Sequence, residues 1–251
     1  MPTLDPSKSA ALVTGHSRGI GEAIAAHLLA RGVRVFGVAR KPNSALANRF
    51  STLRQASVDV ANGAALTQWL ASGAMRSFFE GVESPLLVNN AGVLQPIGPL
   101  QTQDVELVTR AVAVNVGAVL ALSAAFAQTT TDAADRRILH VSSGAGRKPY
   151  SGWSIYCSTK AAVDHHARCV ALDRTPNLRI GSVAPGVVDT DMQAEIRAST
   201  DERFPDRPRF VAMHRDKALP SPEQIGGRLV EYLLADVFGR EPVFDLRDFV
   251  A

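Results

Sequence analysis

The chain has 251 residues, of which 46% are hydrophobic and 20% charged, and its formal net charge is +3. These values are ordinary for a globular protein and exclude a disordered or fibrous chain. The Lys and Arg residues are scattered, and no apolar run approaches the roughly 18 residues of a membrane span, so neither nucleic acid nor a membrane is expected as a partner. The two cysteines, Cys157 and Cys169, fit neither a disulfide framework nor a metal site. We therefore expect a cytoplasmic protein without bound metal.

Short apolar runs alternate along the chain with longer segments of helical period, which is the pattern of strand–helix units around a mostly parallel sheet. The stronger strand predictions are Ala10–Val13, Val33–Val38, Pro85–Val88, Arg137–Ser142 and Leu178–Ala184, and the weaker ones are Gln55–Val58 and Pro242–Phe244. Apolar spacing of i, i+3 and i+4 predicts helices over Gly19–Ala30, Gly63–Glu80, Thr102–Gln128, Ser154–Arg174 and Ser221–Ala235. The sequence thus predicts one α/β domain over residues 1–251, with a doubly wound sheet of about seven strands.

Residues 187–220 depart from this pattern. The segment is rich in charges and prolines and is too long for an ordinary connection. It is expected to be a lid over a substrate site, or else poorly ordered.

A glycine-rich turn follows the first predicted strand and precedes the first predicted helix. Gly15 permits a tight turn, Gly19 allows close approach of a pyrophosphate, and Gly21 allows close helix packing. The helix N-terminus adds free N–H groups and a positive dipole for phosphate oxygens. The alternative is a glycine turn with a purely structural role.

Just past the second strand, where a site for NAD has a carboxylate for the ribose 2′-hydroxyl, this chain has Arg40 and Lys41. A guanidinium suits a 2′-phosphate, and Arg18 in the glycine turn can approach it from the other side. The sequence therefore favours NADP(H) over NAD(H). The alternative is that Arg40 and Lys41 form a solvated strand end.

Tyr156 and Lys160 lie four residues apart in a predicted helix, so their side chains share one face. A tyrosine acid needs a neighbouring ammonium to match its pKa to the reaction. Ser143 follows a predicted strand at the sheet edge where ligands of open α/β folds bind, and its hydroxyl can hold a carbonyl oxygen. Asn115 lies inside a long apolar helix, where its amide needs partners or marks a distortion of the helix.

These motifs resemble those of the short-chain dehydrogenase/reductase family, whose fold is a single-domain Rossmann-like doubly wound sheet, over nearly the whole chain from Ala10 to Phe244. The resemblance implies that Tyr156 donates the proton, Ser143 orients the carbonyl and Lys160 binds the nicotinamide ribose and lowers the tyrosine pKa. It also implies that Asn115 anchors a proton-relay water. The cofactor contacts that follow from the turn and from the resemblance are Gly15, Ser17, Arg18, Gly19, Ile20, Gly21, Arg40, Asp59, Val60, Asn89, Ala91, Gly92, Tyr156, Lys160, Pro185, Gly186, Val188 and Thr190.

Within the family, the sequence around Trp153 and Asp191 is similar to the sepiapterin and benzil reductases, which reduce one carbonyl of a vicinal dicarbonyl. This similarity implies an NADPH-dependent carbonyl reductase with substrate contacts from Ala145, Trp153 and Asp245. Trp153 could instead pack at the helix start, and Asp245 could be an ordinary acid at a strand end.

Other functions remain open at this stage. The chain could be a catalytically silent NADP(H)-binding regulator, an alcohol dehydrogenase or a reductase of acyl-carrier-bound ketones. The long apolar helices suggest a homodimer or homotetramer. His16 has no assigned role, Cys157 is interpreted as a packed side chain, and His165 and His166 are expected on the helix surface.

Overall fold

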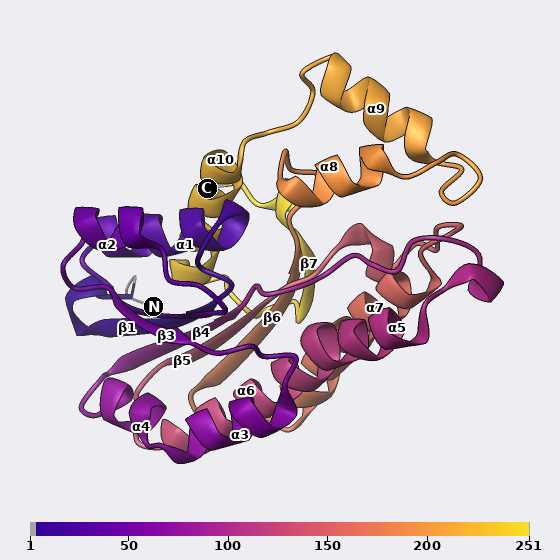
Figure 1. Cartoon of the computed structure of the whole chain (residues 1–251). Coiled ribbons are helices and arrows are strands. Elements are labelled where there is room, and N and C mark those ends of the chain that lie inside the picture. Colours follow the sequence, from indigo (N-terminus) through magenta and orange to yellow (C-terminus); the bar gives the residue numbers. More distant parts are fainter. Residues whose placement is uncertain (1–3, 251) are drawn as a thin grey trace.

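The computed structural model describes residues 4–250, and within them a single sheet of parallel strands forms the centre of the molecule (Figure 1). Its strand order is β3-β2-β1-β4-β5-β6-β7. The strands are β1 (Ser9–Thr14), β2 (Arg34–Ala39), β3 (Arg54–Ser57), β4 (Ser84–Asn89), β5 (Arg136–Val141), β6 (Leu178–Ala184) and β7 (Val243–Asp245). Both weaker strand predictions are confirmed, as edge strands, and every pairing is parallel rather than mostly so.

Helices cover both faces of the sheet, as its doubly apolar strands require. One face packs on α1, α2 and α10, and the other on α3, α4, α6 and α7 (Figure 1). The helices of the described residues are α1 (Gly19–Ala30), α2 (Ser44–Arg49), α3 (Gly63–Ala71), α4 (Ala74–Phe79), α5 (Val105–Val112), α6 (Ala118–Thr129), α7 (Ser154–Leu172), α8 (Asp191–Ala198), α9 (Arg207–Arg215) and α10 (Pro222–Leu234).

Two helix predictions need correction. The predicted single helix Gly63–Glu80 is interrupted between α3 and α4, because Gly73 adopts φ +77°. A left-handed glycine ends a helix, and apolar spacing alone does not detect it. The short helix α2 was not predicted, although Asn43 caps it by accepting from the Leu46 N–H at 2.8 Å.

The predicted long helix Thr102–Gln128 begins three residues late, where Asp104 caps α5, and reaches Thr129 through a π-helical turn, Ala113–Gly117. This helical segment, Val105–Thr129, is long and apolar enough to span a membrane by length and composition, a test that core helices also pass. Here it packs against β4, β5 and α7.

The segment 187–220, which the sequence predicts to be a lid or else poorly ordered, forms the two helices α8 and α9. The two helices project beyond the carboxyl ends of the strands (Figure 1). They lie where a cover over a site at that sheet edge has to lie.

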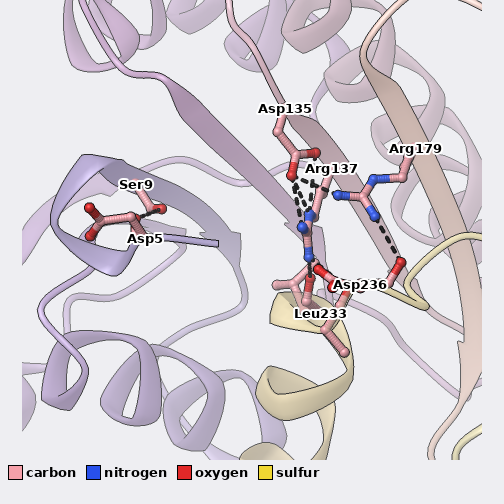
Figure 2. Close-up of polar contacts among 8 residues, drawn as sticks. Asp5, Ser9, Asp135, Arg137, Arg179, Leu233 and Asp236 are labelled. Carbon is pink, nitrogen blue, oxygen red and sulfur yellow. Dashed lines mark hydrogen bonds and ion pairs between the residues drawn. The ribbon is translucent and has the colours of Figure 1, made fainter. Parts of the chain in front are cut away.

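Charged side chains also tie the opposite, amino ends of β5 and β6 to the end of α10 (Figure 2). The Arg137 guanidinium, 1% exposed, donates to the Leu233 carbonyl at 2.6 Å and the Ala235 carbonyl at 3.0 Å. It also donates to Asp135, which accepts from Arg179 as well, at 2.6 Å. The cluster fixes the last turn of α10 to the sheet.

Candidate active site

The glycine turn between β1 and α1 depends on each of its three glycines. Gly15 and Gly19 have φ of +69° and +59°, a conformation that side-chain-bearing residues rarely adopt. A Cβ on Gly21 would lie 2.2 Å from the Gly15 carbonyl oxygen, so only glycine permits this packing. Arg18 occupies the N-cap position of α1, but its side chain makes no capping hydrogen bond. The N–H groups of the first turn therefore stay available. The turn therefore fits a pyrophosphate.

Thr14 and Asn90 support this turn from beneath. The Thr14 hydroxyl accepts from the N–H groups of Asn90 and Ala91, each at 3.0 Å. The Asn90 amide donates to the Thr14 carbonyl at 2.9 Å and to the Gly15 carbonyl at 3.3 Å. Sequence analysis did not single out Asn90. It assigned the cofactor contact to Asn89, whose side chain instead donates to Ser123 and His140, each at 3.2 Å, in the interior.

His16 is a buried support of the same turn. Its Nε2 lies 2.7 Å from Gln55 Oε1, which also accepts from the Asn43 N–H at 2.6 Å. The ring fills the space above Gly37, where a Cβ would lie 2.3 Å from it. Burial lowers the pKa of His16, so the imidazole is neutral at pH 7. The residue joins the glycine turn to β3 and α2.

The cations predicted to select the nucleotide are exposed at the carboxyl edge. Arg40 is exposed at the end of β2. Arg18 forms an ion pair of 2.6 Å with Asp191 at the start of α8, so the glycine turn and the 187–220 segment are directly connected. Asp59 accepts from the Ala61 N–H at 3.0 Å and pairs with Arg110 at 3.1 Å. Burial opposes ionisation of Asp59, but these bonds and charges hold its pKa below its ordinary value.

The structure brings Ser143, Tyr156 and Lys160 together at the same edge. Ser143 follows β5, where its hydroxyl caps the next turn by accepting from the Ala145 N–H at 3.1 Å and acts to lower the pKa of the Tyr156 phenol. Lys160 lies one turn further along α7, with Nζ 5.7 Å from the centroid of the Tyr156 ring and 2.8 Å from the Val141 carbonyl to which it donates. Gly92 borders the ammonium, since a Cβ there would lie 3.7 Å from Nζ. A hydroxyl, a phenol and an ammonium thus converge on one point.

Burial shifts both titrating groups toward their neutral forms. It raises the pKa of Tyr156 to about 12, against the hydrogen bond from Ser143, and lowers that of Lys160 to about 8, against the charge of Asp164. Tyr156 therefore holds its proton at neutral pH, as a proton donor must. Lys160 titrates close to neutral pH.

Asn115 lies in the π-helical turn, and the two structural alternatives that the sequence left open for it occur together; the proton-relay role stays a prediction. The helix is distorted there, and the amide finds partners. Its oxygen accepts from the Val93 N–H and its nitrogen donates to the Val93 carbonyl, both at 2.8 Å, and to the Thr159 hydroxyl at 3.1 Å. It therefore fixes the chain after β4 against α7.

An aromatic cluster covers Tyr156. Trp153 is 4% exposed and stacks on Phe204 at 4.3 Å with an interplanar angle of 5°. Trp153 also forms a T-shaped pair with Tyr156, with ring centroids 5.6 Å apart, and Ala145 is buried in the same cluster. The Met192 sulfur of α8 lies 4.0 Å from the Tyr156 hydroxyl. Phe204 and Met192 belong to the 187–220 segment, and sequence analysis assigned neither of them a role in the site.

Another group of predicted residues lies along the chain between the end of β6 and the end of β7. Pro185 and Val188 are buried, Gly186 has φ +83°, and Thr190 is the N-cap of α8. Asp245 is not unpaired, because it binds Arg247 at 2.7 Å. This pairing favours the strand-end interpretation of Asp245.

Comparison with known proteins agrees with this site. The family model described as short chain dehydrogenase matches residues 9–201. The chain belongs to the short-chain dehydrogenase/reductase family. It is therefore an oxidoreductase of a family that uses NAD(P)(H).

Individual relatives indicate the subgroup within the family. The chain is 33% identical to a benzil reductase ((S)-benzoin forming) of Bacillus cereus, over 90% of this chain and 94% of the relative. It is 32% identical to the sepiapterin reductase of Meriones unguiculatus, over 75% and 78%. Among solved structures, a short-chain dehydrogenase/reductase from Burkholderia vietnamiensis is 45% identical with a TM-score of 0.71, covering 98% of this chain and 100% of that one. The KRED1-Pglu enzyme is 33% identical with a TM-score of 0.82, covering 94% and 99%.

Proposed function

We propose that this chain is an NADPH-dependent carbonyl reductase that reduces one carbonyl of a vicinal dicarbonyl. The observation that carries the proposal is the convergence of Ser143, Tyr156 and Lys160 beneath an aromatic cover. The names of the benzil and sepiapterin reductases support the substrate class. Arg40 and Arg18, with no carboxylate at the end of β2, support the choice of NADP(H).

The residues divide the work of such a reaction. The α1 N-terminus and the glycine turn hold the pyrophosphate, and Lys160 holds the nicotinamide ribose. The bound nicotinamide supplies the hydride. Ser143 orients the carbonyl oxygen, and the Tyr156 hydroxyl delivers the proton to it. The Lys160 ammonium stabilises the phenolate that remains.

The segment 187–220 acts in this proposal as a lid. Met192 occupies the approach to the Tyr156 hydroxyl, and Phe204 stacks on Trp153 as an aryl ring of a substrate would. A substrate therefore has to displace α8 and the turn that follows it, which are held to the glycine turn by the Arg18–Asp191 pair. Closure of such a segment excludes water from the reacting atoms.

Assembly into a homodimer or homotetramer accompanies the proposal. Large apolar side chains are exposed on the α5–α7 side of the sheet, at Leu107, Val112, Leu120 and Leu172. Light scattering of the purified chain tests it, and a monomer would contradict it.

The decisive experiment follows NADPH consumption with benzil, sepiapterin, a simple ketone and a ketoacyl thioester, repeated with NADH. We expect rapid turnover of a dicarbonyl with NADPH and slow turnover of the simple ketone. Preference for the thioester would assign a ketoacyl reductase instead. Tight NADPH binding without turnover would favour the silent regulator.

A further inference from the structure

A carboxylate that no catalytic role yet explains lies directly behind the active site. Asp164 is on α7, one turn after Lys160, and its side chain is 2% exposed. Its Oδ1 accepts from the hydroxyls of Ser142 and Ser182, each at 2.6 Å, and its Oδ2 accepts from Arg147 Nε at 3.2 Å. All three partners are donors, as an ionised carboxylate requires. A buried charge is costly, and structures keep one only where partners compensate it.

The carboxylate is coupled to the catalytic groups by the chain itself. Ser142 directly precedes Ser143, so its bond to Asp164 fixes the backbone that presents the Ser143 hydroxyl. Gly146 packs the turn after Ser143 against α7, since a Cβ there would lie 3.0 Å from Asp164 Oδ2 and 2.9 Å from the Lys160 carbonyl carbon. Residues i and i+4 of a helix share a face, which places the Asp164 charge on the same side as Lys160.

We propose that Asp164 is a positioning residue that keeps Lys160 in its ammonium form and fixes the turn carrying Ser143, with Arg147 limiting the charge that Lys160 experiences. The inference rests on the roles proposed above for Ser143, Tyr156 and Lys160. Its electrostatic part concerns the chain alone and does not need cofactor or substrate.

The charges around Lys160 determine the direction in which its pKa should move in each variant. Burial pulls the pKa of Lys160 down to about 8, and the charge of Asp164 is the opposing influence. On the neighbouring strand β5, His140 is uncharged at neutral pH, because burial and its neighbours His166 and Lys160 lower its pKa to about 3. On β7, Asp245 is compensated by Arg247. Arg147, 29% exposed, shares its guanidinium between Asp164 and the Phe244 carbonyl.

Lysine NMR tests the electrostatic part on the protein without ligands. The chain has five lysines, so ¹³Cε labelling gives few signals, and Lys160→Met identifies the one of interest. We expect the Lys160 midpoint of Asp164→Asn to fall by about one pH unit and that of Arg147→Met to rise by about half a unit. Asp164→Asn can keep the hydrogen bonds, because both serine hydroxyls can also accept. Asp173→Asn, at the end of the same helix, is the matched control and should leave the midpoint unchanged.

Opposite signs in the two variants support the proposal. A folded Asp164→Asn variant with an unchanged midpoint would overturn it, and so would shifts of the same sign in both variants. If Asp164→Asn does not fold, Arg147→Met decides alone, since a midpoint that does not rise contradicts the proposal.

Kinetics separate this inference from the proposed function. With NADPH and a dicarbonyl, the alkaline limb of kcat/KM should move with the Lys160 midpoint in each variant. Signed NMR shifts without turnover of any carbonyl would uphold the role of Asp164 and reject the reductase. Turnover with unmoved midpoints would uphold the reductase and reject the role of Asp164.

Discussion

Strand β5 has a buried ionic cluster at each end, and the two clusters differ in the charge at their centre. At the amino end, Arg137 lies among Asp135, Arg179 and carbonyls of α10 (Figure 2). At the carboxyl end, Asp164 lies among two hydroxyls and Arg147, one helical turn from Lys160. One cluster centres on a buried cation and the other on a buried anion.

The difference follows from the direction of a parallel sheet. Ligands of open α/β folds bind at the carboxyl edge, so a charge there acts on a reacting group. The amino edge of β5 faces the end of α10, whose last carbonyls attract a cation. We therefore expect the amino-end cluster to govern stability and the carboxyl-end groups to govern activity.

The largest expected effect is on activity at the carboxyl end. Tyr156→Phe keeps the ring against Trp153 but removes the proton donor, and we expect kcat to fall by about 10³-fold or more. Stability should change by less than about 1 kcal/mol, because the hydroxyl has few partners. The readout is NADPH oxidation with the best substrate, beside thermal unfolding. Tyr232→Phe in α10 serves as the control and should keep its kcat; activity above a tenth of the original in Tyr156→Phe would remove this tyrosine as the acid.

The next effect is on stability at the amino end. Arg137→Met leaves Asp135 and the Leu233 and Ala235 carbonyls at the end of α10 without their buried donor, which costs about 3–5 kcal/mol of unfolding free energy. The kcat/KM of the folded variant should stay within about twofold. Urea unfolding and steady-state kinetics measure the two quantities. Arg179→Met is the comparison, since this side chain is 27% exposed and should cost only about 1 kcal/mol. Equal costs would show that burial of Arg137 does not set the effect.

Cofactor selection should show a smaller effect at the carboxyl edge. Arg40→Ser removes an exposed cation, so we expect NADPH to lose about tenfold in kcat/KM while NADH is unchanged. Stability should not move, because exposed charges contribute little. Arg34→Ser, at the other end of β2, is the matched control. An equal loss with both cofactors would mean that Arg40 contacts no 2′-phosphate.

The sequence predicted the catalytic residues and the glycine turn at the carboxyl edge of the sheet, but it predicted neither of the two ionic clusters. Tyr156 and Lys160 are joined by helical periodicity, and Ser143 and the glycine turn follow apolar strands, so each has a local signal. Asp164, Arg147 and Ser182 come from separate elements, and their meeting depends on the packing of α7 on β6. The same holds for Phe204 on Trp153 and for Arg137 on α10. Side-chain contacts across distant segments have no periodic signature.

The smallest expected effect is on the pH dependence of stability, which separates charge from hydrogen bonding in the amino-end cluster. Burial by itself raises the pKa of Asp135, but the hydrogen bonds and charges of Arg137 and Arg179 hold it below the ordinary 3.8. The unfolded chain therefore takes up a proton here before the folded one does, and the stabilisation is present above about pH 4 and lost as the pH falls below it. Asp135→Asn should be less stable than the original chain at pH 6, and the difference should narrow toward pH 3. Urea unfolding across that range measures it, with Asp132→Asn as the exposed control. A difference that stays constant with pH would assign the cluster's contribution to hydrogen-bond geometry, and charge would then matter only at the carboxyl end.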